Sequence, residues 1–300
     1  MAGRPPPPVP EPAPAAQAAQ EPTAPSPEHR EGDVPPWPLW TVPAAIVLGL
    51  GLGTVATIMV EVIGALGGSR LGHPAPAVSI AGDIVFDLSF VAAAVYFARL
   101  SPGGSLADFG FRRVALRRGV GAVILAVLAY YILTAVYAAL VHLHGKDKLP
   151  SELGVSHSTA ALVGAAVFVC AVAPICEELF FRGFVFGALR HLRIRVAGRH
   201  LGVWVAAALT GILFGAVHLS SAPVQYLVPL GFLGFVLCVV RWRTGSLYPC
   251  IALHSANNAL ALGVNELGWN AGEIAALILG AWVVVGLVTG PLGARSPRLT

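Results

Sequence analysis

The sequence has 300 residues, of which 56% are hydrophobic and only 11% are charged, and its mean hydropathy is +0.75. A soluble domain carries about 25% charged residues, so this composition excludes an ordinary soluble protein and indicates a membrane protein. The net charge of +4 comes from arginines in connecting segments, so it does not call for a nucleic-acid partner.

The first 36 residues hold 12 of the 24 prolines and show no apolar periodicity. Such a segment cannot bury enough surface to offset its ordering entropy, so we expect a disordered cytoplasmic tail over residues 1–36. It has no apolar core of the kind found in signal peptides. After it we expect a transmembrane domain over residues 37–292 and a short cytoplasmic tail over residues 293–300.

Eight apolar runs approach the ~20 residues that a helix needs to cross a bilayer. The predicted fold class is therefore all-α, a polytopic membrane helix bundle of about eight transmembrane helices. The runs are Thr41–Ala65, Ser79–Leu100, Val120–Val141, Ala160–Phe181, Leu201–Leu219, Val224–Val240, Leu247–Val264 and Ile274–Val288.

The Lys and Arg residues fall almost entirely in one alternate set of connections. That set holds 15 of them, and the opposite set holds only Arg70, Lys146 and Lys148. Because cytoplasmic loops retain Lys and Arg, both termini are predicted to be cytoplasmic. We expect a multi-pass protein of the cell inner (plasma) membrane.

The first polar cluster is Glu177-Glu178-x-x-x-Arg182, inside the apolar stretch VCAVAPICEELFFRGFVFG. Charges at bilayer depth cost at least ~2.5–3.5 kcal/mol each, so they indicate a functional site by default. On a helix Glu178 and Arg182 share a face and can form an ion pair, whereas Glu177 is turned about 100° away. Pro174 removes a helix hydrogen bond and can open the backbone nearby. An ion pair that only locks helices together would explain Glu178 and Arg182 but leave Glu177 unpaired.

Two further clusters lie in later runs. Phe214-x-x-x-His218 ends the fifth run, where a lone histidine is more often a packing residue than a catalyst. His254-x-x-x-Asn258 lies in the seventh run, and Asn257 competes with Asn258 for the same helix face. Together the three clusters form a polar core large enough for water and a peptide carbonyl.

These ordered motifs, EExxxR, FxxxH and HxxxN, resemble those of the CPBP family of intramembrane endopeptidases, which includes the CAAX prenyl protease 2 enzymes. The resemblance covers roughly Ala160–Leu262. It implies hydrolysis of a peptide bond by a glutamate-activated water. It makes Glu177 the general base, supported by the other two charged residues of its motif. His218 would orient the water, and the HxxxN pair would stabilise the oxyanion. The catalytic set that it implies is Glu177, Glu178, Arg182, His218, His254 and Asn258.

The depths of these residues in the membrane do not match well. Glu177 and His254 lie at mid-membrane depth by this topology, whereas His218 lies nearer the outer end of its run. We therefore expect the fifth helix to start later than its apolar run, or to tilt or break near Gly211 and Gly215.

Two histidines and a glutamate are also the ligands of many catalytic zinc sites, which is the alternative that keeps the same residues. The chain has no HExxH motif, and the resemblance implies a metal-independent enzyme, so we expect no cofactor.

A catalytic Cys176 is disfavoured because a thiolate beside two carboxylates is unfavourable. Four cysteines within or at the ends of the apolar runs imply no disulfide framework: Cys170, Cys176, Cys238 and Cys250.

Two other function classes stay open. In a transporter, Glu61, Asp83 and Asp87 would join an ion path. More simply, Asp83 and Asp87 would line a polar helix face near the outer surface or pair with arginine. A non-catalytic immunity or scaffold protein on the protease fold is the third class.

The Ala-, Gly- and Arg-rich composition is typical of a high-GC bacterium. The expected partners are a bacterial peptide or membrane-protein substrate and membrane lipid, without nucleic acid.

Overall fold

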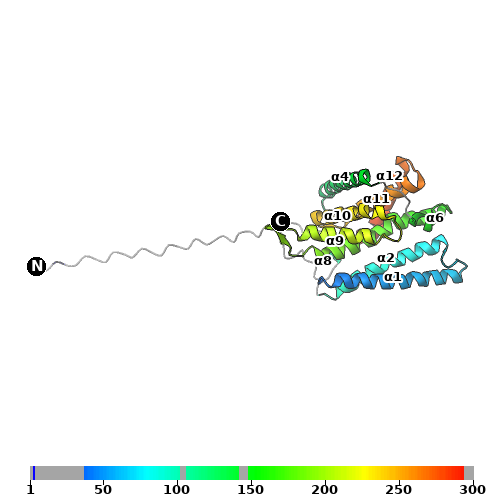
Figure 1. Cartoon of the computed structure of the whole chain (residues 1–300), viewed down its shortest axis with the longest axis horizontal. Coiled ribbons are helices and arrows are strands. Elements are labelled where there is room, and N and C mark those ends of the chain that lie inside the picture. Colours follow the sequence, from blue (N-terminus) through cyan, green and yellow to red (C-terminus); the bar gives the residue numbers. More distant parts are fainter. Residues whose placement is uncertain (1–2, 4–36, 102–105, 142–147, 294–300) are drawn as a thin grey trace. The chain divides into compact units, whose positions relative to one another are not determined.

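The computed structural model describes Gly3 and residues 37–101, 106–141 and 148–293, and nearly all of these lie in helices (Figure 1). The polytopic helical fold class is confirmed. The tails predicted over residues 1–36 and 293–300 lie outside the described residues, apart from Gly3 and Gly293. The eight predicted runs correspond to α1 (Thr41–Leu66), α2 (Pro76–Arg99), α4 (Leu116–Leu140), a composite helix (Thr159–Leu189), α9 (Gly202–Ala216), α10 (Leu227–Thr244), α11 (Tyr248–Ala261) and α12 (Ala271–Thr289).

Six segments of the described chain are long and apolar enough to cross a membrane. These are α1, α2, α4, the composite helix, Val224–Thr244 and Ala271–Leu292. The other two predicted runs form shorter helices, since α9 has 15 residues and α11 has 14 before it continues into the π-helical η5 (Leu262–Leu267). The number of eight crossings and the cytoplasmic termini remain predictions.

Short elements connect these helices. They are α3 (Leu106–Phe109), α5 (Leu149–Glu152), η4 (Val224–Tyr226), η6 (Gly290–Leu292) and an antiparallel hairpin of β1 (Arg195–Val196) and β2 (Arg199–His200). The hairpin turns through Ala197 and Gly198, both with positive φ (48° and 79°). A two-residue hairpin of type I′ needs positive φ at both positions, which Gly198 accepts readily. The sequence analysis did not predict this hairpin.

The composite helix is the structural centre of the protein. It consists of α6 (Thr159–Val167), the π-helix η2 (Phe168–Val172), α7 (Ala173–Glu177), the π-helix η3 (Glu178–Val185) and α8 (Phe186–Leu189). It ends at Leu189, so the predicted end at Phe181 was wrong. The helix continues because Arg182 is neutralised within it rather than exposed to lipid. π turns are rare and frequently mark functional sites.

Burial separates this centre from its surroundings. In the composite helix 44% of the most apolar window is buried within the protein, against 11% for both α1 and α4. The composite helix packs against α2, α9, α10, α11 and α12. Every residue of η3 is buried, and its aromatic rings fill the core. The outer helices instead expose large apolar side chains, as expected for lipid-facing surfaces.

Helices α9 and α10 approach each other through their backbones. A Cβ added to Gly211 would lie 2.7 Å from Gly231 O, and one added to Gly215 would lie 2.5 Å from Leu227 O. Small residues permit such close approach in membrane helices. Helix α9 starts at Gly202, one residue after the start of the predicted run, and runs unbroken through both glycines, so of the expected alternatives the break does not occur. The glycines serve packing.

Helix α2 runs parallel to the composite helix. Ile80 contacts the backbone at Gly164, because a Cβ there would lie 3.0 Å from Ile80 Cδ1. Ten residues later, Phe90 packs edge-on against Phe180 with ring centroids 4.9 Å apart. The two contacts occur in the same order along both helices, so the helices run in the same direction. The face of α2 between Ile80 and Phe90 therefore lies along the segment from Gly164 to Phe180.

Candidate active site

The predicted ion pair between Glu178 and Arg182 is present. Arg182 Nη1 lies 2.8 Å from Glu178 Oε1, and both side chains are fully buried. The arginine also lies over an aromatic face, with Cζ 4.3 Å from the centroid of the Phe214 ring. A buried charge is tolerated only when it is paired, and this arginine has both a carboxylate and a π face.

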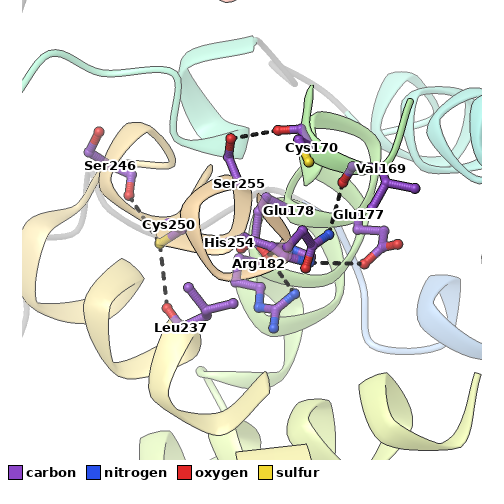
Figure 2. A network of polar contacts seen from close by, with 11 residues as sticks. Val169, Cys170, Glu177, Glu178, Arg182, Leu237, Ser246, Cys250, His254 and Ser255 are labelled. Atoms are coloured by element: carbon purple, nitrogen blue, oxygen red, sulfur yellow. Dashed lines mark hydrogen bonds and ion pairs between the residues drawn. The ribbon is translucent and has the colours of Figure 1, made fainter. Parts of the chain in front are cut away.

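His254 on α11 connects the two glutamates (Figure 2). Its Nδ1 lies 2.8 Å from Glu178 Oε1, and since a carboxylate only accepts, Nδ1 carries the proton and donates. Its other nitrogen, Nε2, lies 3.7 Å from Glu177 Oε2. Glu178 thus fixes the orientation of the imidazole and leaves Nε2 directed to Glu177.

The two adjacent glutamates have different surroundings. The Glu178 side chain is fully buried and contacts two basic groups, whereas the Glu177 side chain is 20% exposed. Glu177 Oε2 is itself buried and accepts no hydrogen bond in the described part of the chain. Glu178 Oε2 is likewise buried without a hydrogen bond in the described part of the chain, so the two carboxylates differ in the partners of Glu178 Oε1 and in exposure.

His218 follows α9 in a turn and joins the cluster through Phe214. Its Nδ1 lies 2.8 Å from Phe214 O, so Nδ1 donates and Nε2 is free to accept. The Phe214 ring lies between two imidazoles, with its centroid 5.0 Å from that of His218 and 5.5 Å from that of His254. The structure therefore places His218 beside the cluster through the Phe214 ring.

Two side chains of α11 bind carbonyls beside Pro174. The missing N–H of Pro174 would otherwise bond Cys170 O in an α turn or Val169 O in a π turn. Ser255 Oγ donates to Cys170 O at 2.5 Å, and Asn258 Nδ2 donates to Val169 O at 2.9 Å. The proline opens the backbone, and α11 satisfies the carbonyls that it releases.

Ser255 is a site residue that the sequence analysis missed. It is fully buried and lies next to His254 in the LHSANN segment. The available signal was the proline itself, because a proline within a buried helix predicts carbonyls in need of donors on a neighbouring helix.

The structure also distinguishes the two adjacent asparagines. Asn258 faces the composite helix, whereas Asn257 Oδ1 accepts a hydrogen bond from Tyr131 Oη of α4 at 3.4 Å. The two amides therefore point to different helices. Asn258 is the one beside the site, and its observed contact docks α11 onto η2.

The four cysteines are all free and buried. Cys176 is 5% exposed, next to Glu177. Among the described residues, no group of three His, Cys, Asp or Glu side chains is arranged to hold a metal ion.

The comparison with family models identifies one domain. Residues 158–260 match the family described as type II CAAX prenyl endopeptidase Rce1-like. No curated protein and no solved structure matches the chain. The matched range agrees with the resemblance over Ala160–Leu262 and contains all three motifs and the clustered residues above. The chain therefore carries a CPBP-family domain of the Rce1-like type over residues 158–260.

Proposed function

We propose that this multi-pass membrane protein is an intramembrane endopeptidase in which Glu177 activates the attacking water. The family match supports a protease of this kind. The observation that carries the glutamate mechanism is the difference between the two adjacent carboxylates. Glu178 Oε1 is held by Arg182 and His254, both at 2.8 Å, whereas Glu177 is 20% exposed and lies 3.7 Å from His254 Nε2.

A separation of 3.7 Å is long for a direct hydrogen bond and leaves Glu177 open to water. In the proposed reaction Glu177 takes a proton from water as the oxygen bonds to the carbonyl carbon, and the C=O π electrons move to oxygen. When the tetrahedral intermediate collapses, the C–N bond breaks and its electron pair stays on nitrogen. The nitrogen takes the proton from Glu177, which restores the base.

The oxyanion needs donors aimed at it. His254 can supply one from Nε2 when its ring is charged, and the ionised Glu178 at Nδ1 stabilises that charge. Asn258 uses one Nδ2 hydrogen on Val169 O and has a second for the oxyanion. His218, with Nε2 free to accept, would help orient the water. A lost donor of this type costs about 2.7–4 kcal/mol of transition-state stabilisation.

The proposed enzyme uses no metal, resides in the bacterial inner membrane, and acts on a peptide or membrane-protein substrate. The matched family is named for endopeptidases of prenylated CAAX termini. A prenylated substrate is therefore one arm of any substrate screen, beside unmodified peptides.

The test is hydrolysis of a quenched peptide library by the detergent-purified protein. The library contains prenylated and unprenylated peptides. Wild type, Glu177→Gln and chelator-treated wild type are compared, with Glu61→Gln as a control because Glu61 is a glutamate on the peripheral helix α1. We expect cleavage that survives chelation and Glu61→Gln but falls at least about 100-fold in Glu177→Gln. If a chelator abolished cleavage and zinc restored it, the metal-independent mechanism would be overturned, although the same residues would still form the active site.

A further inference from the structure

One face of α2 presents carboxyl groups to the composite helix. Asp87 lies seven residues after Ile80 and three before Phe90, and residues at these spacings share a helix face. Ile80 and Phe90 both contact the composite helix, at Gly164 and Phe180. Asp87 is therefore held opposite α7, which carries Glu177, and α2 packs directly against α7.

Asp87 and Glu177 each lie three residues before one member of the Phe90–Phe180 contact, so on these parallel helices they face each other one turn earlier. Asp87 Oδ2 is buried and has no hydrogen-bond partner in the described part of the chain, and the same holds for Glu177 Oε2. From the sequence, Asp87 was expected to join an ion path, to line a polar helix face or to pair with arginine. The structure instead places it beside the proposed base.

Two buried carboxyl groups at one site cannot both carry a charge at moderate cost, so such pairs lose their protons in two separated steps. We propose that Asp87 is a positioning residue that forms with Glu177 a carboxyl pair holding one proton, which resides on Asp87 while Glu177 is the ionised base. This inference rests on the proposed function for its catalytic meaning.

The proposed reaction decides which carboxyl keeps the proton, because it needs Glu177 as the base. Asp87 Oδ2 and Glu177 Oε2 are both buried and have no hydrogen-bond partner in the described part of the chain. A second anion here would also oppose the oxyanion that develops during hydrolysis. A protonated Asp87 therefore keeps Glu177 as the single negative base.

The other titratable groups around Asp87 do not replace Glu177 in this role. On α7 the neighbour is the Cys176 thiol, and on η3 the charges of Glu178 and Arg182 are paired with each other. Cys170 on η2 is a buried thiol, and α6 contains no titratable side chain. On α1, Glu61 lies between the contacts Thr57–Gly82 and Gly64–Val78, nearer to Asp83.

The first test needs no substrate. Infrared difference spectra of the purified protein at neutral pH report protonated carboxyl groups. We expect a protonated-carboxyl band that is lost in Asp87→Asn and retained in Asp83→Asn, the matched control one turn earlier. Glu177→Gln removes the neighbouring negative charge that makes Asp87 keep its proton. Asp87 should then lose its proton, and the band should disappear, at a lower pH than in wild type.

Identical spectra for wild type and Asp87→Asn would overturn the carboxyl pair, whether or not the protein is a protease. If Asp87→Asn does not fold, the spectra of Glu177→Gln serve as the test. A protonated-carboxyl band with the same pH dependence in Glu177→Gln as in wild type would overturn the carboxyl pair. This readout separates failure of the pair from failure of the proposed function.

The second test uses the pH dependence of kcat/KM. Because wild type needs one proton on the pair, its activity should fall at high pH as Asp87 loses that proton. Asparagine imitates the protonated aspartate, so Asp87→Asn should remain active at neutral pH and lose this high-pH decline, whereas Asp83→Asn should keep it. A wild-type profile in Asp87→Asn, only scaled down, would show a structural role and contradict the proposal.

Discussion

The composite helix and α1 are both apolar, long enough to span a membrane and rich in small residues, yet they have opposite environments. The composite helix is enclosed by five helices and carries two π segments, a proline and an ion pair. Helix α1 is a regular α-helix in which only five residues are buried. The comparison shows that hydropathy identifies a membrane helix, whereas buried polar groups and backbone irregularity identify the one that carries the chemistry.

The largest effect should come from breaking the ion pair inside the composite helix. Arg182→Met keeps most of the packing volume but leaves Glu178 with His254 as its remaining partner. Removing one member of a buried pair costs about 3–5 kcal/mol, so the free energy of unfolding in detergent should fall by that amount.

The matched control is the double variant Glu178→Gln/Arg182→Met, in which no buried charge is left unpaired and Gln can still accept from His254 Nδ1. It should be more stable than Arg182→Met alone and yet inactive. Equal stability of Arg182→Met and wild type would refute the buried pair as an energetic element.

The next effect tests close backbone packing between interior helices. Gly215→Ala places a Cβ 2.5 Å from Leu227 O, and overpacking of this kind costs about 1–3 kcal/mol. Gly286→Ala on α12 is the control, because its Cβ would meet nothing within 4 Å. Thermal unfolding of both variants should separate them, and equal melting temperatures would contradict the packing argument.

A smaller effect should link Ser255 to Pro174. Ser255→Ala leaves Cys170 O without its donor, which costs about 1–3 kcal/mol. Pro174→Ala restores an N–H that can serve this carbonyl, so Ser255→Ala should cost less in that background. A double-mutant cycle on unfolding measures the coupling, expected at about 0.5–3 kcal/mol. Strict additivity would mean that the serine does not compensate for the proline.

The smallest effect should appear on the lipid-facing helices. Leu125 of α4 is 70% exposed, so Leu125→Ala should change the free energy of unfolding by no more than about 0.5 kcal/mol. Leu237→Ala on α10, where the side chain is fully buried, should cost about 2–5 kcal/mol in the same assay. Similar losses would remove the distinction between interior and periphery.

The sequence predicted the helical class, the segment that carries the domain and the pairing of Glu178 with Arg182, because these follow from hydropathy and from spacing along one helix. It did not predict which partner His254 would take, since that depends on how α11 packs against η3. It indicated Asp87 only as part of an ion path or a polar helix face, and it missed Ser255, whose contact with Cys170 joins helices distant in sequence. The sequence shows no clear pattern for the π segments except Pro174. It therefore did not predict how they change which residues share a face of the composite helix.

The two π segments carry a consequence for changes in chain length. Each π turn holds one more residue than an α turn, so it behaves as an inserted residue that the helix has absorbed. Deleting one residue from η2 would therefore return it to an ordinary α turn and leave the flanking segments in register. The same deletion in α6 would rotate everything after it by about 100°, and Glu177 and Glu178 would face different neighbours although every motif residue was still present. Homologous chains of this type should therefore tolerate single-residue gaps between Phe168 and Val172 better than within Thr159–Val167.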